Sequence, residues 1–231
     1  MADRDRPLLA VLIDADNVPA KHAEAILKEI GAIGEPALRR VYGDWSSGQL
    51  SGWSKKIQAL GLVAHQESAN TTRKNASDIG LVIDAMDILH TGRFDGFVLV
   101  SSDSDFTALA NRLREDGRTV IGIGERKTPE ALINVCNRFV FLENIGTQDA
   151  PAQPSGSKAA DALPLIEAAM ERLDQDSDWF SLGIIGQMIQ SQRPDFDTRT
   201  YGYRKLSGLV GDIKSLETKK EGNHLLIRLK D

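Results

Sequence analysis

Two pairs of aspartates each follow a short apolar run that has the length of a buried strand. Asp14 and Asp16 end the stretch VLIDAD, and Asp103 and Asp105 stand in SSDSD after the run FVLV. A further carboxylate, Asp78, opens a helix-like segment in KNASDIG. Carboxylates in such places serve different chemistries, because one Asp can act as a nucleophile towards phosphate, while several together can hold a metal ion.

Carboxylates that gather in one place repel one another, so their grouping needs a physical reason. A single Asp after a strand is explained equally well as a helix cap. Two pairs at the ends of apolar strands are harder to explain by capping, because like charges in a low dielectric cost free energy. A divalent cation removes that cost, and oxygen ligands suit Mg²⁺ or Mn²⁺. Such a metal activates water and neutralises a phosphate, and Lys74 adds a positive charge for the same anion.

The first 146 residues alternate between strand-like and helix-like segments. This alternation predicts an α/β domain with a parallel sheet and helices on both faces, in which ligands bind at the carboxyl ends of the strands. Both Asp pairs fall at such ends. The predicted strands are 8–13, 37–43, 62–67, 96–102, 119–124 and 139–142, and the predicted helices are 20–30, 50–61, 76–90 and 106–116.

A second unit follows a stretch without periodicity. Residues 147–161, TQDAPAQPSGSKAAD, are rich in Pro, Ser, Gly, Ala and Gln, which is typical of a flexible linker. Helices are expected at 162–173, 181–192 and 200–213, before two short strands turned at Glu221-Gly222-Asn223. Three helices and a hairpin predict a small winged-helix domain over residues 162–231.

Composition places the chain among ordinary globular proteins. Of its 231 residues, 41% are hydrophobic and 26% charged, and no apolar run approaches the length of a membrane span. The single cysteine, Cys136, excludes an internal disulfide and a multi-cysteine zinc site, so we expect a cytoplasmic protein. The net charge is −5, but residues 193–231 hold nine Lys/Arg against six Asp/Glu. This local excess suits a phosphate backbone or an ordinary solvated surface.

Three segments resemble the signature segments of the NYN family, a branch of the PIN-like ribonucleases. They are VLIDADN, KNASDIGLVIDAM and FVLVSSDSDFTALANRLREDGRTVIGIG. In order they cover roughly residues 8–146, and SSDSD stands where the family more commonly has SGDSD. The resemblance implies a PIN-like, Rossmann-like fold and a metal-dependent ribonuclease, with endonucleolytic action expected.

The resemblance also implies roles for individual residues. Asp16 either supports the metal ligands without binding the metal or caps a turn. Asp84 and Asp87 are left out of the metal site, because their spacing along the helix separates them from Asp78. Asn17 would support the site and Lys74 would lie at its edge. The residues carried over as ligands of Mg²⁺ or Mn²⁺ are Asp14, Asp78, Asp103 and Asp105.

Other chemistries fit the sequence less well. LIDADNV also resembles the Asp-x-Asp motif of haloacid-dehalogenase-like phosphatases, with Asp14 as nucleophile and Asp16 as acid and base. A helix-like segment begins at about Pro19, however, which leaves little room for the loop and flap of those enzymes. Cys136 lies in the apolar stretch LINVCNRFVFL, which is typical of an inert core cysteine.

The C-terminal part resembles the LOTUS domain, also called OST-HTH. The residues that carry the resemblance are SLG, PDFD and YGYRKL, within about residues 162–231. The resemblance implies a winged helix that binds RNA, single-stranded or structured, or a protein partner. Tyr201 is either a base-stacking residue or part of the core. The expected phosphate contacts are Arg199, Arg204 and Lys205 on the third helix and Lys219 and Lys220 on the wing.

The sequence therefore predicts a two-domain protein. Residues 1–146 form a PIN-like nuclease domain, residues 147–161 a linker, and residues 162–231 an OST-HTH domain that holds RNA. A second hypothesis is a non-catalytic RNA-binding or regulatory protein that keeps the nuclease fold, because a fold does not by itself establish turnover. The sequence leaves open the RNA target and the oligomeric state.

Overall fold

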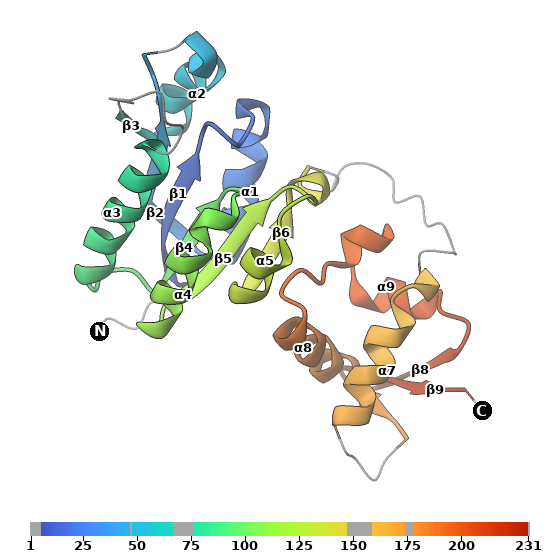
Figure 1. The fold of residues 1–231 in the computed structure, drawn as a ribbon. Helices are drawn as coiled ribbons and strands as arrows, with labels where there is room; N and C mark the ends of the chain where they lie inside the picture. The colour runs from blue at the N-terminus through green and yellow to red at the C-terminus, as the bar shows by residue number, and fades with distance from the viewer. Residues whose placement is uncertain (1–5, 47, 67–75, 147–158, 174–177, 231) are drawn as a thin grey trace. The chain divides into compact units, whose positions relative to one another are not determined.

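The chain is represented by a computed structural model, which describes residues 6–46, 48–66, 76–146, 159–173 and 178–230. The described part divides into two compact units, with the boundary between Ile145 and Gly146 (Figure 1). Most of the predicted linker, 147–161, lies outside the described residues. Within the described residues, no helix is long and apolar enough to cross a membrane.

The first unit is built on a six-stranded, fully parallel sheet with the order β3-β2-β1-β4-β5-β6. The predicted parallel α/β fold is confirmed. Chain order reverses between β1 and β4, so the sheet has its topological switch point there. The strands are β1 Leu8–Asp14, β2 Glu35–Gly43, β3 Val63–Gln66, β4 Gly96–Val100, β5 Thr119–Gly124 and β6 Arg138–Phe141.

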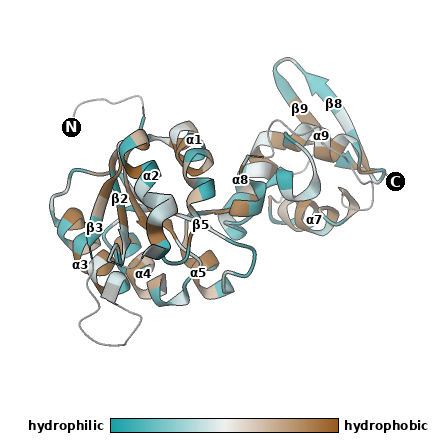
Figure 2. Cartoon of the chain, turned by 90° about the horizontal axis from the view of Figure 1, so that it is seen from above, coloured by the Kyte–Doolittle hydropathy of each residue, from teal (hydrophilic) through white to brown (hydrophobic). Residues whose placement is uncertain are grey.

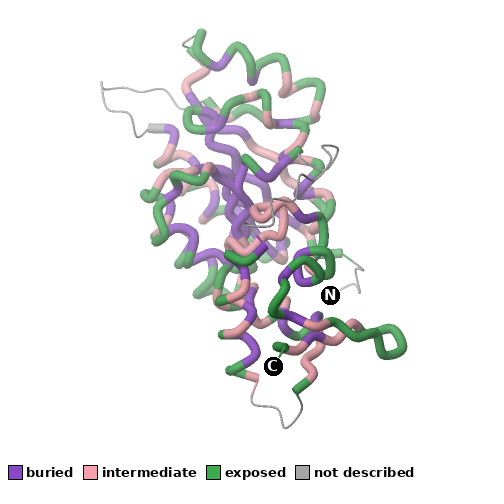
Figure 3. Tube along the Cα trace, turned by 90° about the vertical axis from the view of Figure 1, so that its right-hand side faces the viewer, coloured by how far each residue is buried: buried purple, intermediate pink, exposed green. Residues whose placement is uncertain are grey.

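Helices cover both faces of this sheet. Every residue of β4 is buried, and β1 is buried from Leu9 onward, as a strand between two helical layers must be (Figure 3). One apolar core lies under α3, α4 and α5, and the other under α1 and α2, as the apolar strands between the helices in Figure 2 indicate. These helices are α1 Ala23–Ile33, α2 Ser51–Leu60, α3 Ala76–His90, α4 Thr107–Glu115 and α5 Glu130–Val135.

The switch point places two loops from distant parts of the chain beside each other. Ile13 pairs with Val100 in the ladder between β1 and β4. Asp14 follows Ile13, and Ser101 follows Val100. The two acidic loops therefore leave the same edge of the sheet from adjacent strands. Adjacent strands lie about 4.8 Å apart, so side chains of the two loops can meet.

The second unit packs three helices against a three-stranded antiparallel sheet of order β7-β9-β8. Its core includes Ile166, Ile185, Leu209 and Ile227. Ala159 is fully buried in this core, although the sequence around it has the composition of a linker. The elements are α7 Leu163–Arg172, β7 Phe180–Ser181, α8 Leu182–Gln192, α9 Leu206–Gly211, β8 Leu216–Glu221 and β9 His224–Leu229.

The observed elements differ from the predicted ones in both units. The third helix of the second unit was expected over 200–213, but α9 spans only Leu206–Gly211, after a 3₁₀ turn at Thr198–Tyr201. Gly202 separates the two with φ 86°, a left-handed conformation that ends a helix. In the first unit, α5 lies where the sequence analysis predicted no helix or strand.

Candidate active site

Asp14 is the most buried carboxylate at the carboxyl edge of the sheet, with a relative exposure of 1%. The Asn17 side-chain amide and the Ser101 hydroxyl both donate to its Oδ2, at 2.7 and 2.8 Å. The backbone N–H groups of Asp16 and Asn17 donate to its Oδ1, each at 3.2 Å. Burial raises the pKa of Asp14, and the hydrogen bonds from Ser101 and Asn17 oppose that rise. The carboxylate therefore has a fixed orientation.

Ser101 joins the two acidic loops. While its hydroxyl donates to Asp14, its oxygen accepts from the backbone N–H of Asp103 at 3.1 Å. Asp103 in turn caps the 3₁₀ turn Ser104–Phe106, because its Oδ1 accepts from the Asp105 N–H at 2.9 Å. Sequence reasoning did not single out Ser101. The signal was available, since a serine directly after a buried strand and before an acidic pair is placed to bond both.

Asp78 stands in the first turn of α3 and responds to the other acidic residues. Its pKa is raised to about 6, first by burial and then by the charges of Asp14, Asp103, Asp105 and Asp16, in that order. The other four carboxylates therefore act on Asp78, although the five come from three separate segments of the chain.

Asp16 fastens the start of α3 to the loop after β1. The Ser77 hydroxyl, which is buried, donates to Asp16 Oδ2 at 2.8 Å. This contact spans 61 residues of sequence. Of the two roles that the sequence left open for Asp16, the geometry matches a supporting one, because its carboxylate positions the helix that carries Asp78.

The site supplies only oxygen donors, which is the ligand chemistry that Mg²⁺ and Mn²⁺ prefer. The donor set therefore fits such a metal. Among the described residues, no group of three or more His, Cys, Asp or Glu side chains is already arranged to hold a metal ion. Lys74, the predicted cation at the edge of the site, lies outside the described residues.

Asp84 and Asp87, on the same helix as Asp78, are placed differently. Asp84 forms an ion pair with Arg40 and accepts a hydrogen bond from the Tyr42 hydroxyl. Its charge is thus compensated within the fold, by side chains of β2. Asp87 is exposed.

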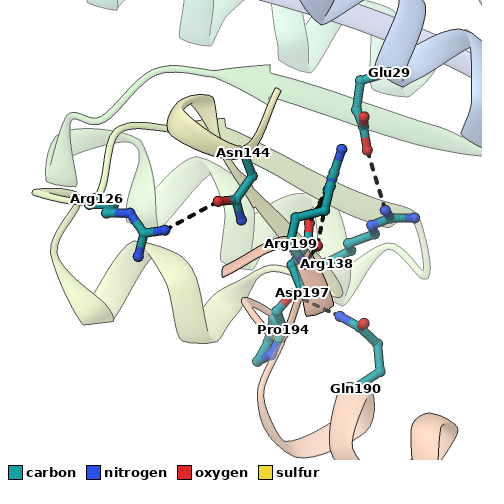
Figure 4. Close-up of polar contacts among 8 residues, drawn as sticks. All are labelled: Glu29, Arg126, Arg138, Asn144, Gln190, Pro194, Asp197 and Arg199. Atoms are coloured by element: carbon teal, nitrogen blue, oxygen red, sulfur yellow. Dashed lines mark hydrogen bonds and ion pairs between the residues drawn. The ribbon is translucent and has the colours of Figure 1, made fainter. Parts of the chain in front are cut away.

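The basic residues predicted on the second unit occupy three different settings. Arg199 lies in the 3₁₀ turn, where its Nε and Nη2 donate to Asp197, at 2.6 Å for the shortest contact (Figure 4). Both side chains of this pair are nearly buried, with 13% and 12% exposed. Arg204 and Lys205 precede α9 and are exposed. The expectation that all three lie on the third helix was wrong, because that helix begins at Leu206.

The remaining two predicted basic residues lie on strand β8. Lys219 is 3.5 Å from Glu221, and its ammonium lies 5.2 Å from the centre of the Trp179 ring. Arg228 of β9 approaches the same ring at 4.9 Å and also pairs with Glu217. Lys220 is exposed. Tyr201, the alternative stacking residue, is half-buried and packs near Phe196 in the core.

Comparison with known families assigns both units. The family model of the NYN domain matches residues 8–143, and that of the OST-HTH/LOTUS domain matches residues 159–227. The chain belongs to the NYN family and carries an OST-HTH/LOTUS domain. The NYN domain places it in the PIN-like nuclease superfamily, whose fold the six-stranded sheet shares. The LOTUS domain is associated with RNA binding.

Comparisons with single proteins add little to these assignments. A comparison with curated proteins gives no match. Among solved structures, a protein of unknown function from Vibrio parahaemolyticus is 20% identical with a TM-score of 0.49, over 60% of this chain and 94% of that one. An oxidoreductase from Thermotoga maritima is 14% identical with a TM-score of 0.36, over 69% and 43% of the two chains. At these scores the likenesses say nothing about function.

Proposed function

We propose that the chain is a metal-dependent ribonuclease that hydrolyses RNA phosphodiester bonds, with endonucleolytic action. The observation that carries this proposal is the convergence of Asp14, Asp78, Asp103 and Asp105 at the switch point of the sheet. The charges of the other three contribute to the raised pKa of Asp78. The free-energy cost of holding like charges together is offset when a cation binds. The membership in the NYN family supports the same reading.

In this proposal the four aspartates hold Mg²⁺ or Mn²⁺. Such a metal, when bound, lowers the pKa of water and neutralises charge on the phosphate. Asn17 and Ser101 orient Asp14 through the two short hydrogen bonds to its Oδ2, and Ser101 also fixes the backbone at Asp103. Asp16 and Ser77 keep the start of α3 in place, so that Asp78 faces the other carboxylates. Lys74 is proposed to add a positive charge for the substrate.

The second unit is proposed to hold the RNA, with Arg204, Lys205 and Lys220 as phosphate contacts. All three are exposed. Lys219 is a weaker phosphate contact in this proposal, because its ammonium already lies near Glu221 and the Trp179 ring. Arg199 is the weakest member of the predicted set, since its guanidinium is already bonded to Asp197. The alternative is that this unit binds a protein partner. In that case a measurement of RNA binding would show no contribution from these residues.

The first experiment is cleavage of labelled single-stranded RNA by the wild type and by Asp103→Asn, with Mn²⁺ and with a chelator. We expect cleavage that needs the metal and falls by at least about a hundredfold in Asp103→Asn. The matched control is Asp87→Asn, which removes an exposed carboxylate from α3 away from the site and should cleave like the wild type. Equal activity of the two variants would contradict the proposed site.

One observation favours a second candidate function, a non-catalytic RNA-binding protein. The described carboxylates converge, but they are not already arranged as a metal-binding group. If the wild type binds RNA but cleaves none of several RNAs with Mg²⁺ or Mn²⁺, this second function replaces the first. A phosphatase is disfavoured, because helical structure begins at Ala20, soon after β1, which leaves little room for the loop and flap of those enzymes.

A further inference from the structure

The loop between β5 and α5 lies on the same edge of the sheet as the acidic site. It forms a tight turn, in which the Thr128 N–H donates to the Glu125 carbonyl at 3.0 Å and the Thr128 hydroxyl donates to the same oxygen at 2.6 Å. Gly124, just before the turn, lies so close to Ser101 that a Cβ would stand 2.7 Å from its carbonyl oxygen. Only glycine permits this approach, so the turn is held against the loop after β4.

A hydrogen bond ties this turn to the acidic loop. The Glu125 N–H donates to the Ser102 hydroxyl at 2.8 Å, and Ser102 directly precedes Asp103. Because β4 and β5 are neighbours in the sheet, their ends are separated by about 4.8 Å. The residue after Glu125 therefore belongs to the turn that contacts the loop carrying Asp103, on the side towards β6.

That residue is Arg126, and the fold holds its side chain in place from one side. Its Nη2 donates to the Asn144 side-chain oxygen at 3.2 Å (Figure 4). Its guanidinium also lies 5.4 Å from the centre of the Phe141 ring. Its backbone N–H donates to Glu143 at 3.0 Å. The contacts come from β6 and the turn after it, yet Arg126 remains exposed.

Arg126 differs from six other arginines among the described residues in the partner of its guanidinium. In the described residues its guanidinium contacts an amide and a ring, and it forms no ion pair with a carboxylate. The arginines that do form such pairs are Arg40, Arg112, Arg138, Arg193, Arg199 and Arg228. An oriented guanidinium without a carboxylate keeps its charge and its remaining donors for an anion, and its planar fork matches phosphate.

We propose that Arg126 binds a backbone phosphate of the RNA next to the one that is cleaved. This inference rests on the proposed nuclease function and assigns Arg126 to the binding of the RNA substrate. The carboxylates of the acidic site repel RNA when no metal is bound, and a fixed cation beside them favours binding of the strand there. Lys127 is less suited to this task, because its ammonium lies 2.6 Å from Glu125 and its side chain is 74% exposed.

Arg93 provides a matched control at the opposite edge of the sheet. It is also exposed, its guanidinium also stacks on a phenylalanine, at 5.7 Å from the centre of the Phe94 ring, and it precedes β4 instead of following a strand end. Arg126→Gln and Arg93→Gln remove the same charge from the same kind of setting. Only the former faces the edge that carries the acidic site.

The experiment measures the Kd of the full chain for fluorescein-labelled single-stranded RNA in chelator, at several salt concentrations. We expect Arg126→Gln to weaken binding by about tenfold and to reduce the slope of log K against log salt by about 0.7, as for one lost phosphate contact. Arg93→Gln should match the wild type. Cleavage with Mn²⁺ should then show an increased KM for Arg126→Gln, with kcat changed less.

The outcomes separate this inference from the proposed function. If the wild type cleaves RNA but Arg126→Gln and Arg93→Gln share its Kd, salt slope and KM, Arg126 is not a phosphate contact and the nuclease assignment stands. If the wild type cleaves nothing but Arg126→Gln alone loses affinity and salt slope, the phosphate contact stands and the nuclease assignment fails.

Discussion

The acidic site of the first unit and the second unit hold their charged residues in opposite ways. At the edge of the six-stranded sheet, four aspartates act on a fifth one, Asp78, which has the same charge, and the bonds that hold Asp14 come from neutral donors such as Ser101 and Asn17. In the second unit, charges of opposite sign lie side by side, as in Arg199 with Asp197 and Arg228 with Glu217.

This difference separates groups that serve the fold from groups that serve a ligand. A pair of opposite charges is satisfied without any partner from outside, although exposed pairs add little stability. A group of like charges costs free energy unless something else binds, so its presence points to a ligand. The functional signal is therefore strongest in the first unit, and within the second it rests on those exposed cations that lie outside the ion pairs, such as Lys205.

Among the changes that test this comparison, the largest expected effect on activity comes from Ser101→Ala, which probes the role of the neutral donors in the acidic site. The change removes the donor to Asp14 and the acceptor for the Asp103 N–H without touching any proposed metal ligand. We expect RNA cleavage to fall by about 10- to 100-fold, because groups that orient metal ligands have effects of this size. Weaker binding of Mn²⁺, followed by titration, should accompany the loss. Ser54→Ala, which removes a hydroxyl that donates to the Leu50 carbonyl just before α2, is the control. A Ser101→Ala enzyme with wild-type rates would show that the neutral donors matter only to the fold.

A second test concerns the cost of the like charges, measured through pH. The pKa of Asp78 rises from 3.8 to about 6 on folding, so the folded protein favours the protonated form. The metal-free protein should therefore lose stability as the pH rises from about 4 through 6. Asp78→Asn should raise the Tm at pH 7 and change it little below pH 4, whereas Asp87→Asn should not do so. Thermal unfolding in chelator measures this, and equal pH profiles for wild type and Asp78→Asn would show that neither burial nor the neighbouring charges raise the pKa of Asp78.

The smallest effects are expected in the second unit. Arg199→Gln leaves Asp197 without its partner in a nearly buried place and should lower the Tm, with little change in RNA affinity. Lys205→Gln should do the reverse, reducing affinity by about threefold and the salt slope by about 0.7. Thermal unfolding and RNA binding over a salt series measure both. If Lys205→Gln and Arg199→Gln weaken RNA binding equally, the division between paired and available cations is wrong for this unit.

Strand and helix positions in the first unit followed closely from the sequence. Apolar runs such as LLAVLI have few alternatives to a buried strand, and the amphipathic spacing of 76–90 gives α3 within the same bounds. The element that was missed, α5, has only six residues, too few for a periodic pattern to be recognised. In the second unit, the expected helix 200–213 was too long because the spacing of its apolar residues continues across Gly202, whose φ of 86° interrupts it.

The sequence by itself determined the residue types at the strand ends, since an aspartate after an apolar run is visible in one dimension. It did not show that Asp14, Asp78 and Asp103 face one another, because that depends on the reversal of strand order between β1 and β4. Nor did it show that Ser101 bonds two acidic loops, or that Asn144 and Phe141 hold Arg126. These contacts join segments far apart in the chain, and only the packing of the sheet decides which of them meet.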